Sequence, residues 1–202
     1  MKSRLLVTAL AVGAFAIPAA SVQAQPLRDR LAAAARMADF GQAEYDYITR
    51  VGPLGQASLQ SSQAARGQAT DPWVRSFAEN EVAEQETLSE ILTEVGRQSG
   101  RPLPNPRPDP RTARELAMMQ RERGDRFDEA YLRMQLQAHQ ELLRIQDDYL
   151  RTGRNMHMRH IAMLARGQIT DHIRQLQLLE RRDDRQDRRD DRRDRRNDYY
   201  RR

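Results

Sequence analysis

Apolar side chains recur at spacings of three and four residues through most of the chain, which is the pattern of amphipathic helices. The pattern predicts four long helices, at residues 46–66, 72–95, 127–152 and 155–180, and two shorter ones at residues 26–40 and 112–123. No run alternates between apolar and polar residues as a half-buried strand does. The chain is therefore predicted to be all-α, with the four long helices forming one bundle.

Five prolines occupy every second position from Pro102 to Pro110, between the second and third long helices. Proline cannot continue a helix, so this segment is expected to run extended as a stiff spacer. Such a spacer suits a crossover connection, which carries the chain from one end of a bundle to the other. The sequence thus favours a four-helix bundle with a Pro-rich crossover linker.

The first 24 residues have the organisation of an export signal. Lys2 and Arg4 precede an apolar run at residues 5–17, which is too short to span a bilayer, and compact residues lead up to Ala24. We expect cleavage near Ala24 and a periplasmic or otherwise secreted bacterial protein. No later stretch approaches 18 apolar residues, so the mature protein is expected to have no transmembrane segment.

The formal net charge of +5 is distributed unevenly along the chain. The leader contributes +2 and residues 181–202, with 11 Arg and 7 Asp, contribute +4, which leaves −1 for the bundle domain at residues 25–180. A domain this close to neutrality lacks the basic surface of a nucleic-acid-binding protein, so charge excludes that class. The Arg/Asp-rich tail is predicted to be disordered, with a positive excess that suits an anionic envelope surface.

Polar residues interrupt the apolar faces of three predicted helices at Glu81, Gln85, His139 and His172. A buried polar group must be hydrogen-bonded or bound to a ligand, because leaving it unpaired costs roughly 1–3 kcal/mol. One interpretation is a satisfied polar network, such as a Glu81–His139 pair. The other is a metal site, because facing helices of a bundle assemble such sites from Glu and His. The absence of cysteine restricts either site to oxygen, nitrogen and thioether ligands.

A second group of candidate ligands lies at the start of the last long helix. Met156, His160 and Met163 share one helical face at positions i, i+4 and i+7. Thioether and imidazole together suit copper(I), which makes these residues a possible copper site. The alternative is that the methionines fill gaps in the core while the histidine is solvated.

The third long helix resembles a known family. Its Phe127, Asp128 and Tyr131, followed by Gln135 and His139, are similar to the Phe-Asp-x-x-Tyr…Gln…His helix of the secreted bacterial family catalogued as domain of unknown function 4142. Residues 74–78 and 169–173 resemble its second-helix and last-helix signatures, and the resemblance covers about residues 39–178. It implies a ferritin-like four-helix bundle.

The chain departs from that family at the positions of interest. The resemblance implies a first-helix Glu where this chain has Ser58, and a second-helix Met and His where it has Glu81 and Gln85. The Glu-x-x-His pairs of di-iron sites are also absent, since Leu136 and Ile169 stand three residues before the two histidines. We therefore expect no di-iron oxidase chemistry. The hypothesis is that Glu81 takes over the acidic role and forms one interior cluster with both histidines.

No phosphate-binding glycine loop, nucleotide fingerprint or nucleophile elbow is found in the sequence. Without these motifs, the sequence favours a non-catalytic, exported envelope or stress-associated bundle that requires no cofactor. The alternative is a metal-binding or metal-sequestering bundle with a degenerate interior His/Glu site, whose cofactor would be a divalent transition metal or copper.

Overall fold

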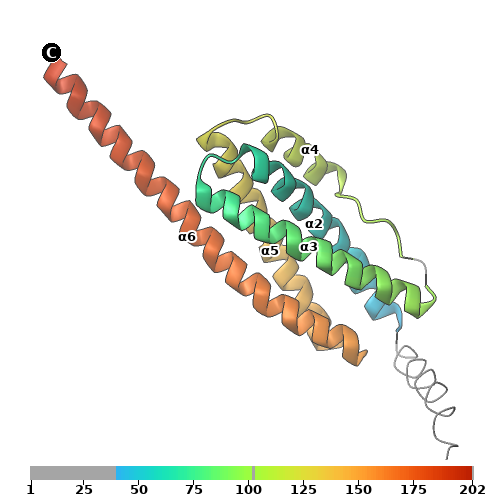
Figure 1. Ribbon diagram of the computed structural model, residues 1–202. Helices are drawn as coiled ribbons and strands as arrows, with labels where there is room; N and C mark the ends of the chain where they lie inside the picture. Colours follow the sequence, from blue (N-terminus) through green and yellow to red (C-terminus); the bar gives the residue numbers. More distant parts are fainter. Residues whose placement is uncertain (1–39, 102, 202) are drawn as a thin grey trace, which may run out of the picture. The chain divides into compact units, whose positions relative to one another are not determined.

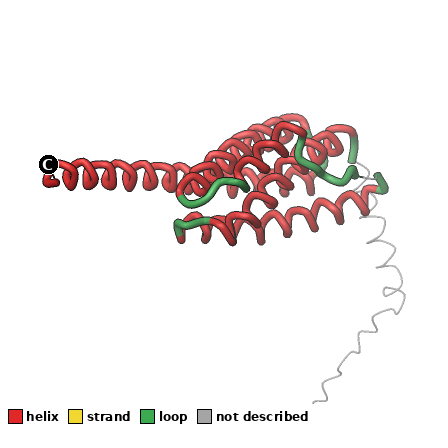
Figure 2. The backbone as a smooth tube through the Cα atoms, turned by 90° about the horizontal axis from the view of Figure 1, so that it is seen from above, coloured by secondary structure: helices red, strands yellow, loops and turns green. Residues whose placement is uncertain are grey.

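The computed structural model describes residues 40–101 and 103–201, with side chains up to Arg182. These residues form five helices: α2 (Gln42–Gln68), α3 (Pro72–Ser99), α4 (Pro110–Met119), α5 (Asp125–Thr152) and α6 (Met156–Arg201) (Figure 1). No strand occurs within this part of the chain (Figure 2), and the all-α prediction is confirmed. The predicted signal peptide and the predicted helix at residues 26–40 lie outside the described residues, which begin at Phe40.

Two long-range contacts define the order of the helices. The Asp128 carboxylate, in the first turn of α5, accepts a hydrogen bond from the backbone N–H of Thr70 in the turn between α2 and α3. At the other end, the Tyr149 hydroxyl donates to Glu44 near the start of α2. Helix α5 is therefore antiparallel to α2 and parallel to α3. A parallel pair needs a long connection, which the linker and α4 supply, so the predicted crossover is confirmed.

The linker at residues 103–109 lies directly on two helices because each of them offers a glycine. A Cβ atom at Gly52 of α2 would lie 3.0 Å from Pro106 Cβ, and one at Gly96 of α3 would lie 2.4 Å from Leu103 Cδ1. Larger side chains at these positions would push the linker away from the bundle. The two glycines therefore determine how closely the linker approaches α2 and α3.

Three helices begin as their local sequences require. The carboxylates of Asp71 and Asp109 accept hydrogen bonds from the backbone N–H groups of Trp73 and Arg111, and a proline follows each Asp as the first helical residue. Helix α5 starts differently, because Gly124 precedes it with a φ of 62°, a conformation that glycine adopts readily.

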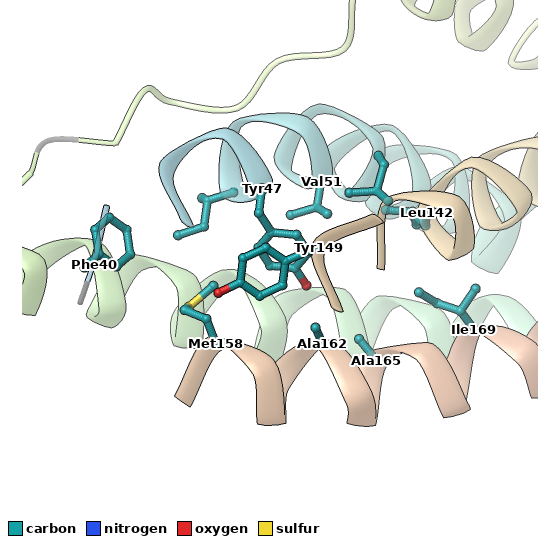
Figure 3. Close-up of a cluster of buried hydrophobic side chains, with 11 residues drawn as sticks. Phe40, Tyr47, Val51, Leu142, Tyr149, Met158, Ala162, Ala165 and Ile169 are labelled. Atoms are coloured by element: carbon teal, nitrogen blue, oxygen red, sulfur yellow. The ribbon is translucent and has the colours of Figure 1, made fainter. Parts of the chain in front are cut away.

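The bundle core consists of two apolar clusters. One surrounds the stacked rings of Tyr47 and Tyr149, whose centroids lie 4.4 Å apart (Figure 3). The other surrounds Phe77 and Tyr131, which meet edge to face. Between the two clusters, at one level of all four long helices, lie the buried polar side chains that we call the polar layer: Ser58, Ser61, Ser62, Glu81, Gln135, His139 and His172.

Helix α6 continues through the Arg/Asp-rich segment to Arg201, whereas composition alone predicts disorder from residue 181. Extending an existing helix avoids the cost of nucleation, and Arg is a good helix former. Oppositely charged Arg and Asp also recur at spacings of three and four in this segment. The Arg182 guanidinium lies 3.9 Å from the Asp71 carboxylate and 5.5 Å from the ring centre of Trp73.

None of the described helices has both the length and the apolar character needed to cross a membrane.

Candidate functional site

Three side chains from three helices converge in the polar layer. Glu81 of α3, His139 of α5 and His172 of α6 are 0%, 1% and 8% exposed. Glu81 Oε2 lies 3.4 Å from His139 Nε2 and 3.1 Å from His172 Nδ1, and the two nitrogens are 3.1 Å apart. The structure therefore brings together the three residues that the sequence analysis placed in one interior cluster, which is also the group of possible metal ligands among the described residues.

The backbone of α5 fixes the proton on the His139 ring. Its Nδ1 lies 2.8 Å from the carbonyl oxygen of Gln135, one turn earlier. A carbonyl can only accept a hydrogen bond, so Nδ1 carries the proton. In a neutral imidazole this leaves a lone pair on Nε2, the atom that faces Glu81 and His172.

His172 lies between two carboxylates. Its Nε2 is 3.1 Å from Glu84 Oε2, on the side opposite Glu81. Burial alone would lower the pKa of His172, but hydrogen bonds and charge from Glu81 and Glu84 outweigh burial and raise the pKa to about 9. Without a metal ion the imidazole is therefore charged at neutral pH.

The two oxygens of Glu81 have different surroundings. Oε1 receives hydrogen bonds from Ser58 Oγ at 2.5 Å and from Gln85 Nε2 at 2.9 Å. Oε2 is buried and receives no hydrogen bond of good geometry, although it faces both imidazoles. Burial opposes ionisation of Glu81, but its contacts with the histidines and Ser58 outweigh burial, so its pKa lies below the usual range. The site thus holds an ionised carboxylate with one oxygen available to a cation.

Gln135 connects the cluster to α2. Its amide nitrogen donates to Ser61 Oγ at 2.8 Å and Ser62 Oγ at 3.0 Å, while its amide oxygen lies 2.7 Å from Ser58 Oγ. The Tyr131 hydroxyl is 2.9 Å from Ser62 Oγ. Gln135 and Tyr131 both belong to the pattern that resembles the family. Their role here is structural, because they hold α5, which carries His139, in register with α2.

Phe127 and Asp128, the other two motif residues, are also structural. Phe127 is fully buried in the apolar cluster around Tyr131. Asp128 accepts hydrogen bonds from the backbone N–H groups of Thr70 and Asp71 at 3.0 and 2.8 Å and from the Thr70 hydroxyl at 2.7 Å. The motif thus anchors the start of α5 to the turn between α2 and α3.

The predicted copper ligands lie away from the polar layer, in the first turns of α6. Met156 and Met163 are 60% and 48% exposed, and His160 is exposed as well. Met158, in contrast, is fully buried and fills the core. Of these methionines, Met158 is the one that fills a gap in the core, whereas Met156 and Met163 are exposed.

Sequence reasoning missed Glu84 and the serine pair Ser61 and Ser62. Glu84 lies off the apolar face of α3, and only its position three residues after Glu81 indicates that the two carboxylates are neighbours. The serines follow Ser58 by one helical turn, so their spacing was the available signal for a polar face on α2.

Comparisons with known proteins agree with this architecture. A family model described as "Domain of unknown function (DUF4142)" matches residues 26–179. Among solved structures, the chain is similar to the crystal structure of a DUF305 fragment from Deinococcus radiodurans, with a TM-score of 0.63 and 17% sequence identity over 70% of this chain and 97% of that chain. At this identity the likeness shows the fold alone. No curated protein matches the chain.

Proposed function

The chain belongs to the DUF4142 family, whose function is undefined, and on that premise we propose a function from the site itself: an exported, non-catalytic bundle that binds one divalent transition metal ion through Glu81, His139 and His172. The observation that carries the proposal is the convergence of the buried Glu81 Oε2 with two imidazole nitrogens, at an oxygen that accepts no hydrogen bond from a backbone, hydroxyl or amide group. Without metal, the charged imidazole of His172 at 3.1 Å compensates the charge of this carboxylate, and a bound cation would take over that role.

The spacing of the three atoms supports a small cation. Ligand atoms of a tetrahedral zinc site, with bonds of about 2.1 Å, lie about 3.4 Å from one another. The three separations among Glu81 Oε2, His139 Nε2 and His172 Nδ1 are 3.1, 3.1 and 3.4 Å. Two imidazoles and one carboxylate are a donor set typical of zinc and related divalent ions.

The outer partners of the histidines support the same conclusion. Metal-binding histidines donate the N–H that is not on the metal to a carbonyl or a carboxylate. His139 has the Gln135 carbonyl at Nδ1, and His172 has the Glu84 carboxylate at Nε2. In a neutral His139 ring the Gln135 carbonyl places the proton on Nδ1 and leaves the lone pair on Nε2, and Glu84 would let His172 Nδ1 release its proton while Nε2 keeps its own.

The exported location rests on the leader at residues 1–24, and the non-catalytic assignment rests on a sequence without a nucleotide fingerprint or a nucleophile elbow. Mass spectrometry of the protein isolated from a periplasmic extract is expected to give a mature N-terminus at Gln25. Elemental analysis of the same material is expected to find about one equivalent of a divalent transition metal.

Titration of chelator-treated protein tests the site directly. We expect zinc to bind with a stoichiometry of one, and cobalt(II) to give the visible spectrum of a four-coordinate ion. The variants Glu81→Gln and His139→Leu should each lower zinc affinity at least about tenfold. The matched control is His157→Leu, which removes an exposed histidine from the start of α6. Equal zinc affinity in all four proteins would overturn the proposal and leave a metal-free polar network.

A further inference from the structure

The residues of the interior cluster are unequally shielded from solvent. The side chains of Glu81 and His139 are 0% and 1% exposed, whereas that of His172 is 10% exposed. Glu84, whose Oε2 lies 3.1 Å from His172 Nε2, is 31% exposed. The imidazole of His172 therefore stands between an inner carboxylate, Glu81, and an outer one, Glu84. Exposure increases along this line, which marks the side of the cluster nearest to solvent.

The outer carboxylate lies in a hollow between α3 and α6. The hollow has a volume of about 350 Å³, and Glu84 is the one charged side chain among its lining residues. A water molecule takes up about 30 Å³ in the liquid, so the hollow can hold an ion with its first shell of about six waters. Thr87 of α3 and Leu164 of α6, which line the hollow, are both exposed, so solvent reaches it.

Two other sides of the cluster are closed to a hydrated ion. Toward α2, the inner carboxylate is covered by Ser58 and Gln85, which both donate to its Oε1. Toward the start of α3, the ring of Phe77 packs on both imidazoles, with centroid distances of 6.3 Å to His139 and 5.2 Å to His172. An ion that approached from either side would have to displace packed side chains.

A larger cavity beneath the linker also borders both histidines. Its volume is about 740 Å³, and Arg97, Arg101 and Arg107 are among its lining residues. Glu84 lines both spaces, but no arginine lines the hollow between α3 and α6. Because guanidinium groups repel a cation and a lone carboxylate attracts it, charge favours the hollow over the cavity as a route to the cluster.

We propose that a hydrated divalent ion enters through the hollow between α3 and α6, with Glu84 as its first ligand, and passes along His172 to Glu81. The inference rests on the metal site of the proposed function and adds the residue that captures the ion. Along this line the two carboxylates outnumber the one charged imidazole between them, so the net charge attracts a cation.

The first test separates entry from affinity. Chelator-treated full-length protein is mixed with zinc in a stopped-flow instrument, and a competing fluorescent zinc indicator reports the association and dissociation rate constants. Glu84→Gln should lower the association rate constant at least about fivefold, whereas Glu86→Gln, at an exposed position of the same helix, should leave it unchanged. If Glu84 only orients His172, then its loss should speed dissociation without slowing association, and that result would overturn the inference.

The second test uses two matched threonines of α3. Thr87 and Thr93 are both exposed, and each hydroxyl donates to the carbonyl four residues earlier. Thr87 lines the hollow, whereas Thr93 lines the larger cavity. Thr87→Lys should slow zinc association at least about fivefold and Thr87→Asp should speed it, with both effects weaker at high salt. Slower association in Thr93→Lys, with no change in Thr87→Lys, would place the entry route beneath the linker and overturn the inference.

The same measurements distinguish this inference from the proposed function. A wild-type chain that takes up no zinc would overturn both. Zinc binding with a stoichiometry of one, at equal association rates in the wild type, Glu84→Gln and Thr87→Lys, would overturn the entry route alone and leave the metal site in place.

Discussion

The carboxylate of Asp128 holds the backbone of Asp71, a residue 57 positions earlier in the chain, through a 2.8 Å hydrogen bond from the Asp71 N–H. Asp71 in turn caps α3 through its own side chain, which accepts from Trp73. One carboxylate therefore stabilises the residue that starts the next helix, so the first turns of α3 and α5 depend on each other.

Replacing Asp128 by alanine should lower the free energy of unfolding by about 1–3 kcal/mol, because two backbone donors lose a charged acceptor. Chemical denaturation measures the change. Asp125→Ala is the matched control, since Asp125 reaches only the Thr70 hydroxyl at 3.5 Å. Equal losses in the two variants would mean that Asp128 does not anchor the turn.

The interior cluster predicts energetic coupling between Glu81 and His139. In the presence of chelator, Glu81→Met alone leaves charged His172 without one of its carboxylates, and His139→Leu alone leaves Glu81 Oε2 facing a single imidazole. A double-mutant cycle by denaturation should give a coupling of about 0.5–3 kcal/mol. A cycle of His139→Leu with Glu90→Met, at an exposed position of α3, serves as the control and should be additive. Additivity in the first cycle would show that the two residues act independently.

Glu44 should make stability depend on pH in acid. Burial alone would raise its pKa, but the hydrogen bonds from Gly41, Tyr149 and Asn155 outweigh burial, so its pKa in the folded protein lies below 4.5. A carboxyl with a lowered pKa stabilises the fold above its unfolded pKa and loses that contribution as pH falls through the folded pKa. Glu44→Gln should therefore destabilise by about 1.5–3 kcal/mol at pH 7, with a smaller difference below pH 4.5. Glu90→Gln is the control, and a pH-independent difference would contradict the prediction.

The exposed methionines of α6 give a test for copper. If Met156, His160 and Met163 bind copper(I), then their methyl and ring NMR signals should shift at low micromolar metal, while the methyl signal of buried Met158 should not. Unmoved signals at stoichiometric copper would show that these side chains are ordinary surface residues.

Truncation tests the helical tail. Deleting residues 183–202 should reduce the helical circular dichroism in proportion to the residues removed, with the melting temperature within a few degrees of the full-length value, because the core clusters lie before this segment. Deleting residues 181–202 also removes the contacts of Arg182 with Asp71 and Trp73, and should lower the melting temperature slightly further. A large drop for the shorter deletion would mean that the tail docks on the bundle.

Periodicity was sufficient to predict the four long helices, because each helix buries one apolar face whatever its neighbours are, and the alternating prolines predicted the crossover. The same logic identified Glu81, His139 and His172, since a polar residue on an apolar face must be satisfied inside the bundle. Their mutual contact follows from the register of three helices, which sequence alone does not determine.

Other features depend on tertiary contacts or on the local free energy of helix formation. Glu84 stands off the apolar face, so no pattern marks it as a partner of His172. The linker passes directly over Gly52 and Gly96, and this path cannot be read from the prolines. The helical course of the segment after residue 181 depends on the helix that precedes it and removes the nucleation cost, which composition alone does not include.

The polar layer also restricts which packings the sequence can adopt. Apolar side chains are interchangeable enough that a helix could slide by one turn, about 5.4 Å, and still bury leucine and alanine. Such a slip would separate Gln135 from its three serines and place Glu81 against hydrocarbon. Competing arrangements are therefore disfavoured by unpaired polar groups, and replacing the whole layer with apolar residues would permit several sliding states of the bundle in place of one.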